Sequence, residues 1–140
     1  MAQTVAVSPH AGHLRVVETM ARILLAEDDQ SMREFLARAL ERSGHDVTAV
    51  PDGLAALNAI HERPFDLLIA DIVMPGIDGI EVSRQANKVN ADLRVLFITG
   101  FAAVAMSARE EMGDAKVLSK PFHLRDLVDH VEAILEQEVA

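Results

Sequence analysis

Five polar side chains, each just after a short apolar segment, are of the types that carry out phosphoryl chemistry. These residues are Glu27, Asp28, Asp71, Thr99 and Lys120. Carboxylates that lie close together repel one another unless a cation joins them, and a site with only oxygen ligands suits Mg²⁺. A carboxylate can also act as a nucleophile and form an aspartyl phosphate. The pattern therefore predicts a magnesium-dependent phosphoryl site, provided that the fold brings these residues together.

The metal is expected to bind beside the nucleophile. We assign Asp71 as the nucleophile, with Asp28 and Asp71 as ligands of Mg²⁺ and Glu27 binding it directly or through water. The backbone carbonyl of Val73 completes the predicted protein ligands. Lys120 supplies an ammonium group that neutralises phosphoryl oxygens. It directly precedes Pro121, and a cis peptide bond between the two residues could direct the lysine side chain toward the site.

Each residue also has an ordinary structural interpretation. An acidic run before a helix often caps it, and Asp29 is predicted to be such an N-cap. An aspartate before a loop is often a turn residue, and Thr99, whose hydroxyl we expect to bind the phosphoryl group, could simply begin a turn. A single lysine is commonly solvated. The functional interpretation depends on all five residues meeting at one edge of the fold.

The rest of the chain alternates between apolar strands and amphipathic helices. Strands are predicted at 22–26, 46–50, 66–70, 94–98 and 115–119, and helices from 30 to Gly44, over 53–61, 80–88 and 102–112, and from 124 onward. This alternation predicts an α/β fold, a doubly wound five-stranded parallel sheet with helices on both faces. Ligands bind beyond the carboxyl ends of the strands in such sheets, which is where the five polar residues are expected.

Length and composition limit the functional classes. The 140 residues fit one domain, which we place at 20–140, and residues 1–19 are interpreted as a disordered leader, an expression remnant or an upstream start. The net charge of −9 argues against nucleic-acid binding, which needs clustered Lys and Arg. No apolar run approaches the ~20 residues of a membrane span, and the chain lacks cysteine. We expect a cytoplasmic protein that binds neither nucleic acid nor membrane.

The segments ILLAEDD, DIVMPGIDG, FITG and SKPF, in this order and spacing, resemble the response-regulator receiver family from residue 20 to residue 138. The resemblance implies a flavodoxin-like fold with strand order 2-1-3-4-5. It also implies a site on this chain: Asp71 as phosphoacceptor, Glu27 and Asp28 as the acidic metal pocket, Thr99 as the switch hydroxyl and Lys120 as the lysine that pairs with phosphate. Such a domain assists its own phosphorylation and dephosphorylation but is not an enzyme acting on a separate substrate.

More narrowly, AEDDQSMREFL, FITGFAAVA and KVLSKPFHLRDLV resemble the CpdR-type single-domain response regulators of alphaproteobacteria. This resemblance implies that a histidine phosphotransferase or histidine kinase supplies the phosphoryl group. It further implies a role in ClpXP-dependent proteolysis and the cell cycle, with ClpXP components as partners. We expect a monomer or weak dimer.

Two departures from the family's pattern are informative. Many receivers have an aromatic residue where this chain has Val117, and the chain has no tyrosine or tryptophan. We hypothesise that the switch works through residues 99–112, where Gly100 permits backbone movement. Val73 and Phe101 flank the predicted phosphoryl position, and neither can position a water molecule, which predicts slow self-dephosphorylation. The alternative is that both residues simply pack against or cap the loop.

Only one helix follows the fifth strand, so we expect no output domain for DNA binding or catalysis, and a surface must carry the signal. The predicted surface is the face of the fourth helix, fifth strand and fifth helix, with these candidate contacts: Phe101, Met106, Val117 and Phe122. Of these, Val117 and Phe122 are interpreted as ordinary core, and His123 as a surface residue.

Three other functions remain to be weighed. A phosphate shuttle or sink between a histidine kinase and a phosphotransferase would use the same residues, so the sequence leaves it open. A metal-dependent phosphatase with an aspartyl intermediate needs a second aspartate where this chain has Val73. A nucleotide-binding enzyme needs a glycine-rich loop after the first strand, where this chain has acidic residues instead.

Overall fold

The apolar segments form one parallel sheet. The computed structural model describes residues 7–8, 15–16 and 20–136. The strands are β3 (Arg22–Ala26), β4 (Asp46–Val50), β5 (Leu67–Asp71), β6 (Arg94–Thr99) and β7 (Val117–Ser119). They pair in the order β4-β3-β5-β6-β7, and every pair is parallel. Counted without the two short strands near the amino end, this is the predicted 2-1-3-4-5 order, and the fold class is confirmed.

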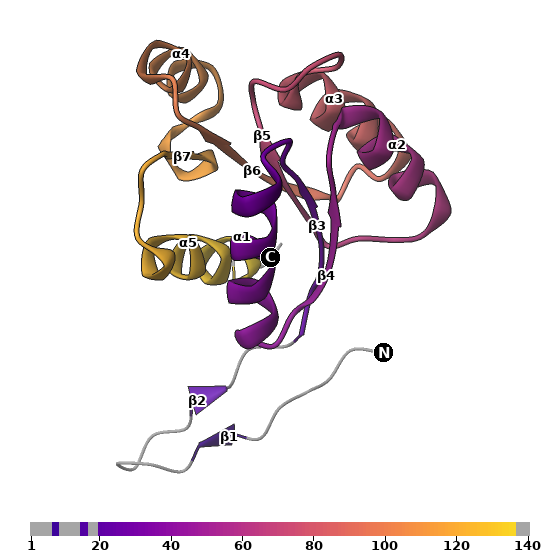
Figure 1. Cartoon of the computed structure of the whole chain (residues 1–140). Helices are drawn as coiled ribbons and strands as arrows, with labels where there is room; N and C mark the ends of the chain where they lie inside the picture. Colours follow the sequence, from indigo (N-terminus) through magenta and orange to yellow (C-terminus); the bar gives the residue numbers. More distant parts are fainter. Residues whose placement is uncertain (1–6, 9–14, 17–19, 137–140) are drawn as a thin grey trace.

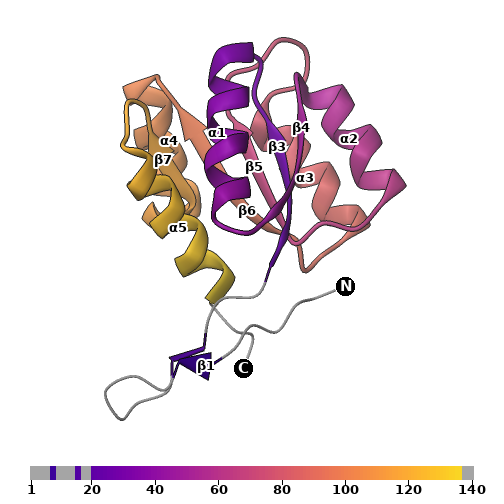
Figure 2. The same ribbon diagram turned by 60° about the horizontal axis from the view of Figure 1, so that its bottom comes forward.

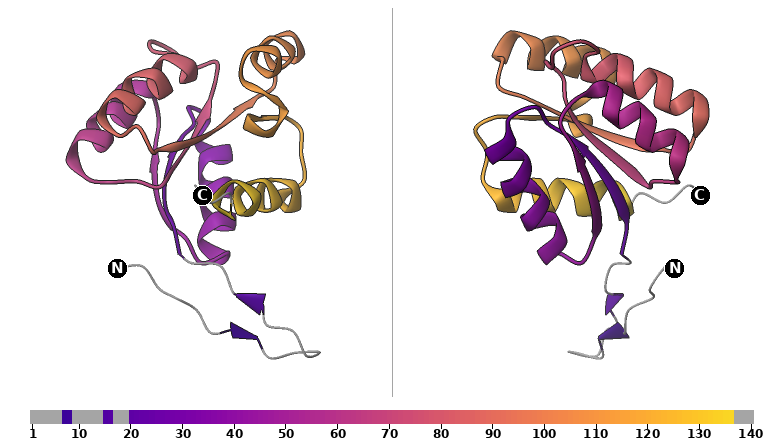
Figure 3. Two further views of the ribbon diagram at one scale, coloured as in Figure 1. Left: turned by 180° about the vertical axis from the view of Figure 1, so that it is seen from behind. Right: turned by 45° about the vertical axis from the view of Figure 1, so that its right-hand side comes forward.

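Helices cover both faces of the sheet. They are α1 (Gln30–Arg42), α2 (Gly53–Glu62), α3 (Gly79–Val89), α4 (Ala102–Met112) and α5 (Leu124–Glu136). Figure 1 and Figure 3 show α1 and α5 on one face and α2, α3 and α4 on the other, and Figure 2 shows α1 and α5 side by side. Within the described ranges, no helix is long and apolar enough to cross a bilayer.

Alternate residues of the central strand β5 supply the two halves of the core. Ile69 packs in one cluster with Leu36 of α1 and Leu127 of α5. Its neighbour Leu68 packs in the other cluster, which includes Val82 of α3. All residues of β5 are buried, because helices cover the strand from both sides. Asp71, the phosphoacceptor candidate, is therefore the last residue of a strand that is buried along its whole length.

α4 is held to the sheet by small side chains. Ala105 and Ala108 pack against Phe97 and Val117, so the prediction that Val117 belongs to the core is confirmed. The helix begins after Phe101, which provides no side-chain cap. By contrast, an aspartate caps each of α1, α2 and α3, namely Asp29, Asp52 and Asp78. α4 thus lacks the N-terminal hydrogen bond that fixes these three helices.

The fifth strand of the sheet is shorter than predicted, and the boundary at residue 115 is wrong. Gly113, with φ of +98°, turns the chain after α4. A 3₁₀ turn then spans Asp114–Lys116, and the ladder with β6 covers only Val117–Ser119. The chain reaches the sheet late because this turn is needed to bring it back from α4.

The predicted leader, residues 1–19, lies mostly outside the described residues. The two described pieces, β1 (Val7–Ser8) and β2 (Arg15–Val16), pair antiparallel with each other. The interpretation of this segment as a disordered leader stays a prediction.

Candidate functional site

The polar residues identified in the sequence lie at the carboxyl ends of four neighbouring strands. Glu27 directly follows β3, and Asp71 is the last residue of β5. Thr99 ends β6, and Lys120 directly follows β7. Parallel strands place these ends along one edge of the sheet, the upper edge of the sheet in Figure 2. The topology therefore gathers side chains from four separate parts of the sequence.

Lys120 joins two of the carboxylates directly. Its Nζ atom donates a hydrogen bond of 2.9 Å to Oε1 of Glu27 and another of 2.9 Å to Oδ2 of Asp71. The peptide bond between Lys120 and Pro121 is cis, as the sequence had suggested it could be. The lysine side chain is 21% exposed, so the ammonium group is mostly withdrawn from water while both of its partners are buried.

Glu27, Asp28 and Asp71 form an acidic cluster. One carboxylate oxygen from each lies within 4.8 Å of the others. Glu27 and Asp71 are buried, with 1% and 6% of their surface exposed, whereas Asp28 is exposed. The cluster therefore has an enclosed floor and one side open to solvent. Such an all-oxygen set with access for water fits Mg²⁺, which usually keeps several of its waters.

Burial and hydrogen bonding act in opposite directions on the ionisable groups of the site. Burial raises the pKa of Glu27 above its ordinary value, and the charge of Asp71 acts in the same direction, while the hydrogen bond from Lys120 opposes both. Burial acts to lower the pKa of Lys120, but its hydrogen bonds to Asp71 and Glu27 outweigh this effect and the pKa is raised. The ammonium group thus keeps its proton and compensates two buried carboxylates, with which it forms ion pairs.

The loop after β5 holds the second oxygen of Asp71. The backbone N–H of Val73 donates to Oδ1 of Asp71 at 3.1 Å. Gly79, at the start of α3, passes so close that a Cβ atom there would lie 2.3 Å from the carbonyl oxygen of Asp71. Only glycine fits at this position, because any side chain would push the strand end or the helix away. The phosphoacceptor candidate is therefore positioned from both sides.

Thr99 lies beside the lysine. The residue is 1% exposed, and the backbone N–H of Lys120 donates to its carbonyl oxygen at 2.8 Å. Its Oγ1 accepts a hydrogen bond of 3.2 Å from the backbone N–H of Phe101. This leaves the hydroxyl hydrogen available for another acceptor. The threonine thereby connects the strand end to the start of α4.

Two arginines that the sequence did not identify contact Glu27 and the residue before Lys120. Nη1 of Arg33, in α1, donates to the carbonyl oxygen of Glu27 at 2.8 Å. Nη2 of Arg109, in α4, donates to Oγ of Ser119 at 2.9 Å, next to Lys120 in the chain. Both are ordinary basic residues of amphipathic helices in the sequence. Helical spacing indicates which face a residue occupies but not which backbone or hydroxyl group its long side chain reaches.

The candidate surface residues divide as expected between surface and core. Phe101 and Met106 are 58% and 61% exposed, so both can contact a partner. Phe122 is partly buried and packs against the core cluster of α1 and α5, so its interpretation as core is confirmed. His123 is exposed, in agreement with its interpretation as a surface residue. Phe101 and Met106 thus give α4 two exposed apolar side chains, while others lie elsewhere on the described surface, such as Leu54 of α2.

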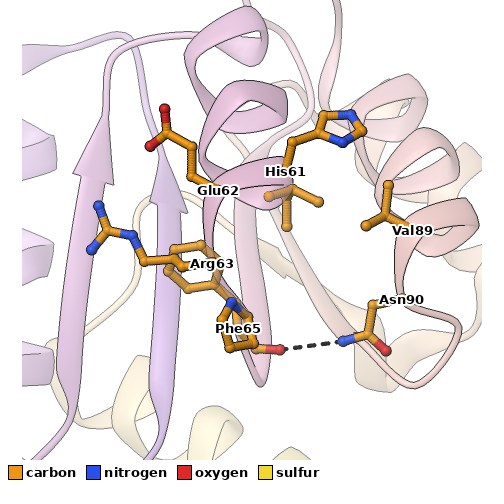
Figure 4. A pocket seen from close by; sticks show the side chains of 8 residues that line it. His61, Glu62, Arg63, Phe65, Val89 and Asn90 are labelled. Atoms are coloured by element: carbon orange, nitrogen blue, oxygen red, sulfur yellow. Dashed lines mark hydrogen bonds between the residues drawn. The ribbon is translucent and has the colours of Figure 1, made fainter.

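A cavity of about 340 Å³ lies at the other end of the sheet. Its walls come from the ends of α2 and α3 and the chain before β5, as Figure 4 shows; they comprise Ile60, His61, Glu62, Arg63, Pro64, Phe65, Val89 and Asn90. Arg63 lies over the ring of Phe65 at 5.9 Å. No member of the acidic cluster lines this cavity, because the cavity lies at the amino end of β5 and the cluster at its carboxyl end.

Comparison with known proteins places this site in a family. The family described as "Response regulator receiver domain" matches residues 23–132. The chain is 56% identical over 117 residues to the response regulator receiver protein CpdR of Brucella abortus, covering 83% of this chain and 98% of that protein. It is 38% identical over 117 residues to the transcriptional regulatory protein TctD of Salmonella typhimurium, covering 83% of this chain but only 52% of TctD.

A solved structure agrees with these sequence matches. The response regulator protein TrrA of Thermotoga maritima, in complex with Mg(2+)-BeF, has a TM-score of 0.71 and 28% identity, covering 82% of this chain and 99% of that one. The fold, the family match and the identity to CpdR together show that the chain belongs to the response regulator receiver domain family.

Proposed function

We propose that this protein is a single-domain response regulator of a two-component phosphorelay and that Asp71 is its phosphoacceptor. The observation that carries the proposal is the pair of 2.9 Å hydrogen bonds from Nζ of Lys120 to Asp71 and Glu27. They place a permanent positive charge against the one carboxylate that ends the central strand. In the reaction, an oxygen of Asp71 forms a bond to phosphorus while the bond from phosphorus to a donor histidine nitrogen breaks, and that nitrogen keeps the electron pair.

We assign the acidic cluster as the magnesium site. Its three carboxylates and the exposed position of Asp28 suit an ion that keeps several waters. The backbone carbonyl of Val73 remains our proposal for the fourth protein ligand. The complex of TrrA with Mg(2+)-BeF supports this assignment, because that protein has the same fold. When bound, Mg²⁺ supplies positive charge that neutralises the oxygens of the phosphoryl group.

The protein's own groups then stabilise the phosphorylated state. Lys120 can exchange its hydrogen bond to Oδ2 of Asp71 for one to a phosphoryl oxygen, since it already points at this carboxylate. Thr99 can donate its hydroxyl hydrogen to a second phosphoryl oxygen, because the bond from Phe101 uses only a lone pair of Oγ1. Both residues would therefore change partners when the group arrives.

These partner changes reach α4, the element that we propose as the switch. Thr99 holds the start of the helix through Phe101, and Ser119 holds its second half through Arg109. α4 has no side-chain N-cap, and the only side chains that it buries fully are the small ones of Ala105 and Ala108, with Val104 and Met112 partly buried. With Val117 buried in place of an aromatic residue, this segment carries the signal to the exposed Phe101 and Met106.

The regulatory role that we propose is that of a CpdR-type regulator of ClpXP-dependent proteolysis in the bacterial cytoplasm. The 56% identity to CpdR of Brucella abortus over nearly the whole of that protein supports this role. A histidine phosphotransferase or histidine kinase would supply the phosphoryl group, and a component of the protease would bind the α4 surface in one of the two states.

The test compares binding with phosphate transfer. The protein and its Asp71→Asn variant are each passed over immobilised ClpX, with and without prior phosphorylation by a small acyl phosphate. Binding that depends on the phosphorylation state of the wild type supports the proposed role. Equal absence of binding in both states, together with rapid return of the phosphoryl group to a histidine phosphotransferase, would instead identify a phosphate shuttle.

A further inference from the structure

Arg33 holds the loop that carries two members of the acidic cluster. Its Nη1 atom donates a hydrogen bond of 2.8 Å to the carbonyl oxygen of Glu27. Its backbone N–H donates to the carbonyl oxygen of Asp29 at 2.8 Å, within the first turn of α1. The side chain of Arg33 therefore binds one end of the three-residue loop from Glu27 to Asp29, and its backbone N–H binds the other end.

The side chain of Glu27 is already fixed by other groups. Its two carboxylate oxygens accept hydrogen bonds from Lys120 at 2.9 Å and from the backbone N–H of Asp29 at 3.1 Å. Its backbone N–H donates to the carbonyl oxygen of Val50 at 3.1 Å. The hydrogen bond from Arg33 fixes the remaining polar group of Glu27, its backbone carbonyl, which lies in the peptide plane between Glu27 and Asp28.

That peptide plane decides where the third carboxylate lies. Asp28 is exposed, and its side chain makes no hydrogen bond to any residue that the structure describes. No side-chain partner therefore orients its carboxylate, and the backbone sets where this side chain starts and in which direction it leaves the chain. Because the peptide before Asp28 is held through its carbonyl by Arg33, this arginine sets the direction from which Asp28 approaches the rest of the cluster.

We propose that Arg33 is a positioning residue of the magnesium site, which keeps the acidic cluster within reach of one ion. The inference rests on the proposed function, since it requires that the cluster bind Mg²⁺. Charge alone predicts the opposite effect: a guanidinium group near the site repels a divalent cation, so its removal would tighten binding. Positioning predicts that its removal weakens binding. The two explanations thus differ in sign.

The experiment measures Mg²⁺ affinity in three variants and the wild type. Arg33→Met removes charge and hydrogen bond but keeps a long, helix-favouring side chain, and Arg33→Lys keeps the charge and one donor. Arg38→Met removes a positive charge from an exposed position of the same helix and serves as the matched control. Titration calorimetry with magnesium chloride is suitable, because the chain has no tryptophan or tyrosine for a fluorescence signal.

We expect Arg33→Met to weaken Mg²⁺ binding about tenfold, the lower range for losing a group that orients a metal ligand. Arg33→Lys should recover part of the affinity, and Arg38→Met should stay within about twofold of the wild type. Phosphorylation of Arg33→Met by an acyl phosphate should return to the wild-type rate at saturating Mg²⁺, because the phosphoacceptor itself is intact. Circular dichroism confirms that each variant is folded.

The outcomes separate the inference from the function on which it rests. If the wild type binds Mg²⁺ while Arg33→Met binds it equally or more tightly, Arg33 has no positioning role. If phosphorylation of that variant stays slow at saturating Mg²⁺, the arginine acts on the reaction itself and the inference is also wrong. If the wild type shows no saturable binding, the magnesium site is wrong and the inference falls with it.

Discussion

Removal of the Lys120 ammonium group should destabilise the metal-free protein, because the carboxylates of Glu27 and Asp71 then repel each other. In Lys120→Met, an apolar side chain replaces the group that donates 2.9 Å hydrogen bonds to both Glu27 and Asp71. Those carboxylates are 1% and 6% exposed, so water cannot fully replace the lost cation. The variant therefore keeps two buried negative charges that face each other without compensation.

The cost follows from burial. Loss of one partner from a fully buried ion pair costs about 3–5 kcal/mol. Lys120 is 21% exposed and the cluster opens to solvent at Asp28, so screening reduces the expected loss to about 2–3 kcal/mol. A domain of this size loses about 4 °C of melting temperature per kcal/mol, which gives a decrease of roughly 10 °C.

The pH dependence has a defined sign. Without the lysine, the pKa of Glu27 rises further, so folded Glu27 holds its proton to higher pH than the unfolded residue, whose pKa is about 4.3. The unfolding free energy of Lys120→Met therefore falls as pH rises through that interval, and the deficit is larger at neutral pH than at mildly acidic pH. In the wild type, the pKa of Lys120 is raised, so its contribution to the free energy of unfolding is fully present up to about pH 10.4, the pKa of an unfolded lysine. At higher pH this contribution is lost as the folded lysine deprotonates.

Urea unfolding followed by circular dichroism in metal-free buffer measures these differences. Lys116→Met, which removes an exposed lysine four positions earlier, is the control and should resemble the wild type. Adding Glu27→Gln to Lys120→Met should restore most of the lost stability, because one of the two facing charges disappears. A Lys120→Met variant within about 0.5 kcal/mol of the control would refute this electrostatic reasoning.

Three further predictions follow from the structure. Gly79→Ala should destabilise the domain by about 1–3 kcal/mol and slow phosphorylation, since its Cβ would lie 2.3 Å from the carbonyl oxygen of Asp71. Gly100→Ala, whose Cβ would have its nearest neighbour at 3.8 Å, is the control and should leave thermal unfolding unchanged. Arg109→Ala should speed hydrogen exchange of the α4 amides in the unphosphorylated protein, because it removes the hydrogen bond from α4 to Ser119, while exchange in α2 should stay the same. Unchanged exchange in α4 would show that the bond between Arg109 and Ser119 has no part in the proposed switch. Phe101→Asn should shorten the lifetime of the phosphorylated protein, because an amide beside the site can position water; an unchanged decay rate would mean that Phe101 only packs or caps the loop.

The sequence indicated the fold well because the central strands are enclosed. β5 reads as a continuous apolar run ending in Asp71, and the structure buries all of it between helices. β4 reads as more polar and lies at the edge of the sheet. In both cases the residues of a strand reflect its surroundings, so the strand positions and the edge position of β4 could be inferred from the pattern. The full strand order was implied only by the resemblance to the receiver family.

The start of β7 could not be inferred in the same way. Residues 115–119 have the composition of a strand, but the ladder begins only at Val117. What delays it is the turn at Gly113 and the 3₁₀ turn after it, whose length depends on how far α4 stands from the sheet. That distance is a tertiary property, and the local pattern does not contain it.

The site shows the same division between what local pattern contains and what it does not. Placement of Glu27, Asp71, Thr99 and Lys120 at strand ends was predictable from the alternation of strands and helices. The partners of Arg33 and Arg109 were not, because a long basic side chain selects its acceptor only after the helix has been docked. These contacts join α1 to the chain at Glu27 and α4 to the chain at Ser119.

The assignment of Asp71 as phosphoacceptor is tested most directly by intact-mass measurement after incubation with a small acyl phosphate, with and without Mg²⁺. Asp71→Asn is the variant, and Asp46→Asn, at an exposed position of the edge strand, is the matched control. We predict one added phosphoryl group in the wild type and in Asp46→Asn, only when Mg²⁺ is present, and none in Asp71→Asn. A phosphoryl group that is still added to Asp71→Asn would contradict the assignment.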